Sequence, residues 1–162
     1  MKIFERILVA VDFSEFSREA LRIAAGLGRT FSSQVLVLHV CSLPRAVNPV
    51  SQAGQQRAIK ALLALQEEVA QAARQKLHDW IEAEQWEKAQ VVSEIGNGLP
   101  YRVITRMADR FEADLIVMGS YGRSGFARML IGSTTEKVLR KSKVPVLAVT
   151  LRRPESPPPK ES

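Results

Sequence analysis

The stretch from residue 113 to residue 150 carries the residue types that could bind a phosphate. It begins with a short apolar run, Asp114–Met118, of the kind that forms a strand buried on both faces. Glycines follow the run, and Ser133 then opens a helical pattern; the glycines are Gly119, Gly122, Gly125 and Gly132. Glycines let backbone N–H groups approach a ligand closely, and the N-terminus of a helix carries partial positive charge. A strand, a glycine-rich loop and a helix in this order therefore predict a phosphate site.

The spacing of three of these glycines is that of a known signature. Gly119, two residues, Gly122, nine residues and then Gly132-Ser133 is similar to the nucleotide signature of the ATP-binding branch of the universal stress protein family. Three further segments carry the same resemblance, namely ILVAVDFSE, VLVLHV and KVPVLAV. The resemblance covers nearly the whole chain and implies an adenine nucleotide, ATP, as the ligand, with Mg²⁺ as a further candidate.

The resemblance also implies which residues touch the nucleotide. Asp12, at the end of the first strand, matches the aspartate that the family uses at the nucleoside, and the backbone of Val40 matches a group that bonds adenine. Met118 would pack near the base, while Ser133 and Thr135 match residues that approach the phosphates. The full predicted set is Asp12, Val40, Met118, Gly119, Gly122, Arg123, Gly132, Ser133, Thr134 and Thr135.

Structural alternatives exist for the residues of this set. The glycines could serve only as loop residues with positive φ. Ser133 begins an S-x-x-E capping box, in which its Oγ would accept from the N–H of Glu136. Asp12 could cap the first helix, and Met118 could simply fill the core.

Periodicity predicts five strands that alternate with four helices, which is an α/β fold with an open, doubly wound sheet and helices on both faces. The strands are expected at 7–11, 34–40, 89–95, 114–118 and 144–149, and the helices from the N-cap Ser14 to 28, at 56–84, at 100–110 and at 134–141. The third strand is more polar and should lie near an edge. The helix at 56–84 is long enough to overhang a small domain, so a bend or an irregular start is expected.

The family resemblance implies a parallel sheet with strand order 3-2-1-4-5, in which the order reverses between the first and fourth strands. Ligands of such sheets bind at the carboxyl ends of the strands that flank this reversal. Asp12 ends one of these strands and Gly119 ends the other. The topology and the glycine motif therefore indicate the same crevice.

Composition and charge limit the remaining classes. The net charge of +6 is concentrated between Gly119 and Lys141, which holds five basic residues against one acidic residue. The sequence has no basic run with interleaved aromatics, so it does not indicate a nucleic-acid-binding protein. No apolar run approaches the ~20 residues that span a bilayer. The single cysteine, Cys41, favours a reducing cytosol and hence a cytoplasmic protein. Residues 1–151 are expected to form one domain, and the proline-rich residues 152–162 a disordered tail.

Other reactive residues are interpreted as structural. His39 lies inside an apolar strand and is expected to be a core histidine, and His78 to be solvated. Cys41 has no histidine nearby in the sequence and is not a candidate nucleophile. The run Gly96-Asn97-Gly98 starts like a dinucleotide fingerprint but is interpreted as a turn, because Pro100 and Tyr101 break the pattern.

The sequence is compatible with three functions. The first is an ATP-binding module of stress response and regulation, in which the family resemblance implies a homodimer and an unidentified protein partner could read the bound state. The predicted dimer contact is the last strand, Val144–Val149, because an apolar edge strand invites pairing. The alternatives are a slow ATPase or phosphotransferase at the same site, and an interaction module that binds no nucleotide. The loop offers no additional carboxylate for hydrolysis, which disfavours a dedicated enzyme.

Overall fold

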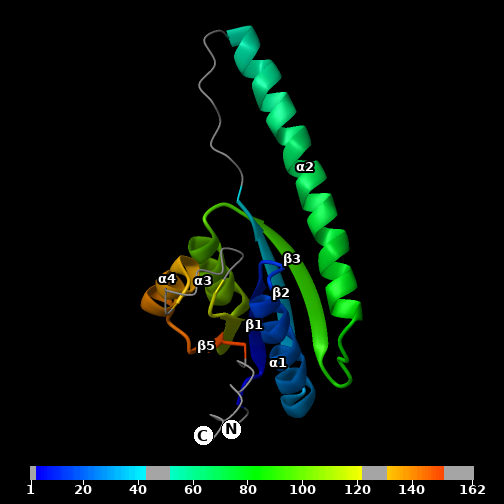
Figure 1. Ribbon diagram of the computed structural model, residues 1–162, viewed down its shortest axis with the longest axis vertical. Helices are drawn as coiled ribbons and strands as arrows, with labels where there is room; N and C mark the ends of the chain where they lie inside the picture. The colour runs from blue at the N-terminus through cyan, green and yellow to red at the C-terminus, as the bar shows by residue number, and fades with distance from the viewer. Residues whose placement is uncertain (1–2, 43–51, 122–130, 152–162) are drawn as a thin grey trace, which may run out of the picture.

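A computed structural model describes residues 3–42, 52–121 and 131–151, with only the backbone described at 52, 53 and 55 (Figure 1). Strands and helices alternate along the chain as the periodicity predicts. In chain order they are β1 (Arg6–Val11), α1 (Glu15–Phe31), β2 (Gln34–Cys41), α2 (Gln52–Glu82), β3 (Gln90–Asn97), α3 (Pro100–Phe111), β4 (Leu115–Gly119), α4 (Ser133–Lys141) and β5 (Val146–Val149). The predicted tail at 152–162 lies outside the described residues.

The five strands form one parallel sheet in the order β3-β2-β1-β4-β5, which confirms the predicted fold class and strand order. In the centre, Ile7 of β1 is in register with Val35 of β2 on one side and with Leu115 of β4 on the other. The order reverses between β1 and β4. The polar strand β3 is an edge strand, as its composition indicates.

Helices α1 and α2 cover one face of the sheet, and α3 and α4 cover the other (Figure 1). On one face, Ile7 and Val9 pack with Leu21 of α1 and Leu77 of α2. On the other face, Leu8 packs in a second buried cluster that includes residues of α3 and α4. Alternate residues of β1 thus point into two separate cores, which is why the central strands are apolar throughout.

Several element boundaries differ from the predicted ones. The strand predicted from Val144 starts at Val146, after a proline that cannot donate to a ladder. Gly96 and Asn97 belong to β3, so of the predicted turn only Gly98, with φ +127°, has a turn conformation. The long helix α2 is one continuous element of 31 residues, so the expectation of a bend or an irregular start is wrong for the described residues, and Figure 1 shows its N-terminal half extending well past the sheet.

Candidate functional site

A cleft of about 510 Å³ opens at the carboxyl ends of the strands, where the strand order reverses. Strands β1, β2 and β4 contribute their last residues, and α2, α3 and α4 contribute side walls. The lining residues are Ala10, Val11, Asp12, Ser17, Leu38, His39, Val40, Cys41, Ser42, Val69, Pro100, Ile104, Met118, Gly119, Tyr121, Gly132, Ser133, Thr134 and Thr135. The structure therefore brings together eight of the ten residues that were predicted from the sequence to touch the nucleotide. The other two, Gly122 and Arg123, lie outside the described residues.

Asp12 holds the turn between β1 and α1. Its Oδ1 accepts from the backbone N–H of Ser14 at 3.0 Å and from the Ser14 hydroxyl at 2.6 Å. Ser14 in turn caps α1 by accepting from the N–H of Ser17 at 3.2 Å, which confirms the predicted N-cap. The Asp12 N–H donates to the Ser17 hydroxyl at 3.2 Å. These bonds fix the Asp12 carboxylate at the cleft wall. Asp12 holds the N-cap residue Ser14 and does not itself cap α1, so the alternative that it caps the helix is wrong.

The N-terminus of α4 faces the same cleft. Its N-cap is Gly132, which lies in the extended region with φ −68° and ψ 148°. The predicted capping box is wrong, because the N–H of Glu136 donates to the carbonyl of Gly132 at 2.9 Å and not to Ser133 Oγ. Ser133 is instead the first helical residue. The sequence could not separate the two cases, since both place a serine within one residue of the helix start.

The first turn of α4 offers a row of backbone donors. The N–H of Gly132 donates to the carbonyl of Ser120 at 2.7 Å. The N–H groups of Ser133, Thr134 and Thr135 have no acceptor inside the helix, because a helix leaves its first donors unsatisfied. No acceptor for them is found elsewhere in the described residues. Three donors at the positive end of a helix, on a cleft wall, form an arrangement that binds anions.

Thr135 ties α4 to the sheet through its side chain. Its hydroxyl donates to the carbonyl of Gly119 at 2.8 Å and is buried. A hydroxyl has one proton, so this bond leaves the backbone N–H of Thr135 as the donor that it can offer a ligand.

Gly119 is required by packing at the end of β4. A Cβ at this position would lie 2.8 Å from the Cβ of Phe16 and 2.9 Å from its carbonyl carbon. The start of α1 therefore approaches β4 too closely for any side chain. This is a structural reason for the first glycine of the motif, and it differs from the positive φ that the sequence analysis gave as the alternative, because Gly119 does not have a positive φ.

His39 is a core histidine, as predicted. Its Nδ1 lies 2.8 Å from the carbonyl oxygen of Val11, and its ring lies 4.4 Å from the ring of Phe13. Phe13 has φ +65°, a conformation that a bulky residue seldom adopts. It also meets Trp80 of α2 edge to face at 5.2 Å. The turn that carries Asp12 is thus held from one side by β2 and from the other by α2.

Sequence reasoning missed several lining residues. Val69 comes from the long helix, and Pro100 and Ile104 come from α3. The position of Pro100 in the first turn of a helix was visible in the sequence, and the strand order could have placed that helix start beside β2. Nothing in the local pattern marks Val69, because its spacing is that of an ordinary helix face.

Comparison with known proteins gives one consistent family. The family model described as "Universal stress protein family" matches residues 3–150. Universal stress protein MJ0531 of Methanocaldococcus jannaschii is 31% identical over 147 residues, which cover 91% of this chain and 82% of that protein. No helix among the described residues is long and apolar enough to cross a membrane.

Solved structures show the same fold. The structure of MJ0577, from the same organism, is 25% identical with a TM-score of 0.76 and covers 94% of this chain and 99% of that one. A universal stress protein in complex with cAMP is 22% identical with a TM-score of 0.59, covering 91% of this chain and 98% of that one.

Proposed function

Because this chain belongs to the universal stress protein family, we propose that it binds an adenine nucleotide, ATP, in the cleft between β1, β4 and α4. The observation that carries the proposal is the row of three backbone N–H groups at the start of α4, which face a cleft at the strand-order reversal. The cAMP complex of a structural neighbour supports an adenine nucleotide as the ligand class.

Each end of the cleft suits one part of the nucleotide. Met118 supplies apolar surface for the base, and the backbone of Val40 can bond adenine. Asp12 supplies a carboxylate that can accept from a ribose hydroxyl or from the adenine amine. The backbone N–H groups of Ser133, Thr134 and Thr135 suit a phosphate. Gly122 and Arg123 are added to the phosphate end on the strength of the sequence motif alone, with Mg²⁺ as a candidate counter-ion of the phosphates.

The test removes one backbone donor without breaking the helix. Proline is tolerated at the first position of a helix, and the extended conformation of Gly132 is the one that a following proline requires. Ser133→Pro therefore deletes one N–H from the site, whereas the matched control Ser133→Ala deletes only the hydroxyl. A charge-assisted hydrogen bond contributes about 1.5–3 kcal/mol, so Ser133→Pro should lower ATP affinity about 10- to 100-fold.

Isothermal titration of protein freed of bound ligand measures the effect. Ser133→Ala should retain most of the affinity, and both variants should melt within a few degrees of the wild type without ligand. Equal affinity of Ser133→Pro and wild type would place the phosphates away from α4. No binding heat with any adenine nucleotide would remove the proposal.

We further propose a cytoplasmic role in stress regulation and a homodimer through β5. This strand is a sheet edge and its Leu147 is 39% exposed, so a second β5 could pair with it across a two-fold axis. An unidentified protein partner would read the nucleotide state of the dimer. Light scattering at micromolar concentration tests the dimer, and a species of 18.0 kDa would contradict it.

A further inference from the structure

Three basic side chains converge on Tyr101, beside the cleft. The Arg102 Nε–H donates to the Tyr101 hydroxyl at 3.0 Å, and the Lys137 Nζ lies 5.4 Å from the centre of the tyrosine ring. The hydrogen bond from Arg102 lowers the pKa of Tyr101, and the positive charges of Arg102, Lys141 and Lys137 lower it further, against an opposing effect of desolvation. The cluster joins the first turn of α3 to α4.

These cations have no acidic partner among the described residues. None of the ion pairs found there involves Arg102, Lys137 or Lys141. The acidic residue in the first turn of α4, Glu136, is engaged by Arg140 at 3.0 Å, and the first turn of α3 has no acidic residue. Arg102 therefore adds positive charge where the helix end is already positive. Such an arrangement is unfavourable alone and becomes favourable when an anion binds.

The cluster borders the nucleotide cleft. Pro100 and Ser133 line the cleft, and Tyr101 is the residue directly after Pro100. Lys137 stands four residues after Ser133, which places both on the same face of α4. Side chains of a helix lean towards its N-terminus, so the long Lys137 side chain extends back towards the turn that presents the free N–H groups.

We propose that Tyr101, Arg102 and Lys137 form a second anion subsite that takes a second phosphate group of the nucleotide bound in the cleft. The proposal rests on the proposed nucleotide function and defines its specificity. The start of α4 holds one phosphate through backbone donors. The guanidinium and ammonium groups hold another through charge-assisted hydrogen bonds, to which the Tyr101 hydroxyl can add a donor. The site should therefore prefer nucleotides with two or more phosphates over AMP.

The second phosphate can belong to the 5′ chain or to the ribose. ATP carries it in the first position and adenosine 3′,5′-bisphosphate in the second, so the two ligands distinguish these cases. Isothermal titration with ATP, adenosine 3′,5′-bisphosphate and AMP is compared for wild type, Arg102→Gln and Lys137→Gln. Each substitution should weaken a ligand with a second phosphate about tenfold or more and change AMP by less than about twofold. Loss confined to ATP assigns the second phosphate to the 5′ chain, and loss confined to the bisphosphate assigns it to the ribose. The control is Arg110→Gln, which removes a charge from the last turn of α3 and should change none of the affinities.

Two outcomes would overturn the subsite. If both substitutions weaken AMP as much as the other ligands, or weaken none of them, the cluster does not bind a second phosphate, although the proposed nucleotide function stands. If wild-type protein binds no adenine nucleotide, the proposed function fails and the subsite fails with it.

A spectroscopic signature distinguishes binding from a structural role of the cluster. The chain has two tyrosines, so Tyr121→Phe leaves Tyr101 as the single phenol. A bound phosphate offsets the surrounding positive charge, so saturating ligand should raise the pKa of Tyr101 in a tyrosinate absorbance titration. A pKa that saturating ATP and bisphosphate leave unchanged contradicts the proposal.

Discussion

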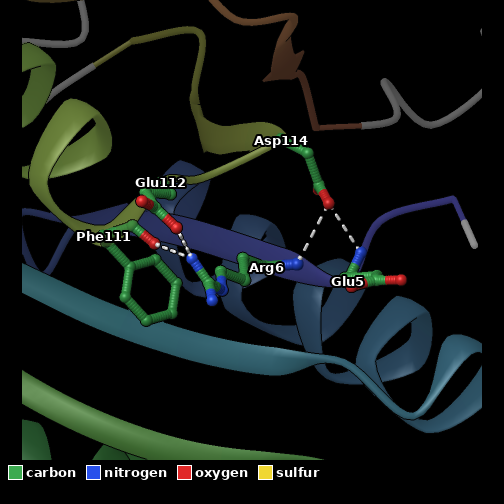
Figure 2. Close-up of polar contacts among 5 residues, drawn as sticks. All are labelled: Glu5, Arg6, Phe111, Glu112 and Asp114. Carbon is green, nitrogen blue, oxygen red and sulfur yellow. Dashed lines mark hydrogen bonds and ion pairs between the residues drawn. The ribbon is translucent and has the colours of Figure 1, made fainter.

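The two ends of the central strands differ in the partners of their polar groups. At the amino ends, Oδ2 of Asp114 accepts from the backbone N–H groups of Glu5 at 2.7 Å and Arg6 at 3.1 Å, and the Arg6 side chain pairs with Glu112 (Figure 2). At the carboxyl ends, the donors at the start of α4 and the cations around Tyr101 find no such partners within the described residues. The unpaired groups at the carboxyl ends lie on a cleft wall and beside it, where a ligand can reach them, whereas Oδ1 of Asp114 at the amino ends is buried and has no partner among the described residues.

The largest expected effect is the stabilisation of the fold by ATP bound at the carboxyl ends of the strands. ATP at about a hundred times its dissociation constant should stabilise the fold by about 2.7 kcal/mol, which for a domain of this size raises the melting temperature by roughly 5–10 °C. Differential scanning fluorimetry measures the rise. At the same ATP concentration, Ser133→Pro should lose about half of the rise if its affinity is tenfold lower and most of it if its affinity is about 100-fold lower. A full rise in that variant would contradict the contrast between the two ends.

A somewhat smaller effect is expected from Asp114→Ala at the amino end. The substitution removes a charged acceptor from two backbone N–H groups and should lower the free energy of unfolding by about 2 kcal/mol. ATP affinity should stay within about twofold of wild type, because the site lies at the opposite end. Urea unfolding and titration measure the two quantities. Asp114→Asn is the control, since its amide oxygen still accepts, and a loss of ATP affinity in Asp114→Ala would show that the ends are coupled.

Ser14→Ala should have an intermediate effect that touches both stability and binding. It removes the N-cap of α1, at a cost of about 1 kcal/mol, and also removes the hydroxyl that holds Asp12. Denaturant unfolding reports the first part and ATP titration the second. Ser14→Asp restores a capping side chain but places a second carboxylate beside Asp12. It should therefore recover stability without recovering affinity; recovery of both would mean that Asp12 is positioned by other groups.

The smallest effect is expected from Glu112→Gln. The ion pair with Arg6 is largely exposed, with 40% and 76% of the two side chains accessible, so its loss should cost less than about 1 kcal/mol and less still at high salt. Unfolding at two salt concentrations checks this. A loss larger than that of Asp114→Ala would show that the ion pair, rather than the Asp114 bonds to the backbone, stabilises the amino end.

The apolar runs predicted the strands, and the family resemblance implied their order and eight of the nineteen residues that line the cleft. Asp12 follows β1 directly and Gly119 ends β4, so the pairing of these two strands brings them together. The capping box failed because a shift of one residue changes the bonds but not the residue pattern. The packing role of Gly119 and the presence of Val69 in the cleft depend on contacts between distant segments, which no local pattern encodes.

The placement of β1 in the middle of the sheet also sets when the cleft can form during folding. Its partner β2 lies 28 residues away along the chain, as for Ile7 and Val35, whereas its partner β4 lies 108 residues away, as for Ile7 and Leu115. Closing the longer loop costs more chain entropy, so the β1–α1–β2 unit can assemble while the partner of its other edge is still absent. On the ribosome, a nascent chain that ends before Ser133 holds Asp12 and Val40 but no helix start to bind a phosphate. The proposed nucleotide site is therefore complete only after residues Ser133, Thr134 and Thr135 have joined the chain that already holds Asp12 and Val40.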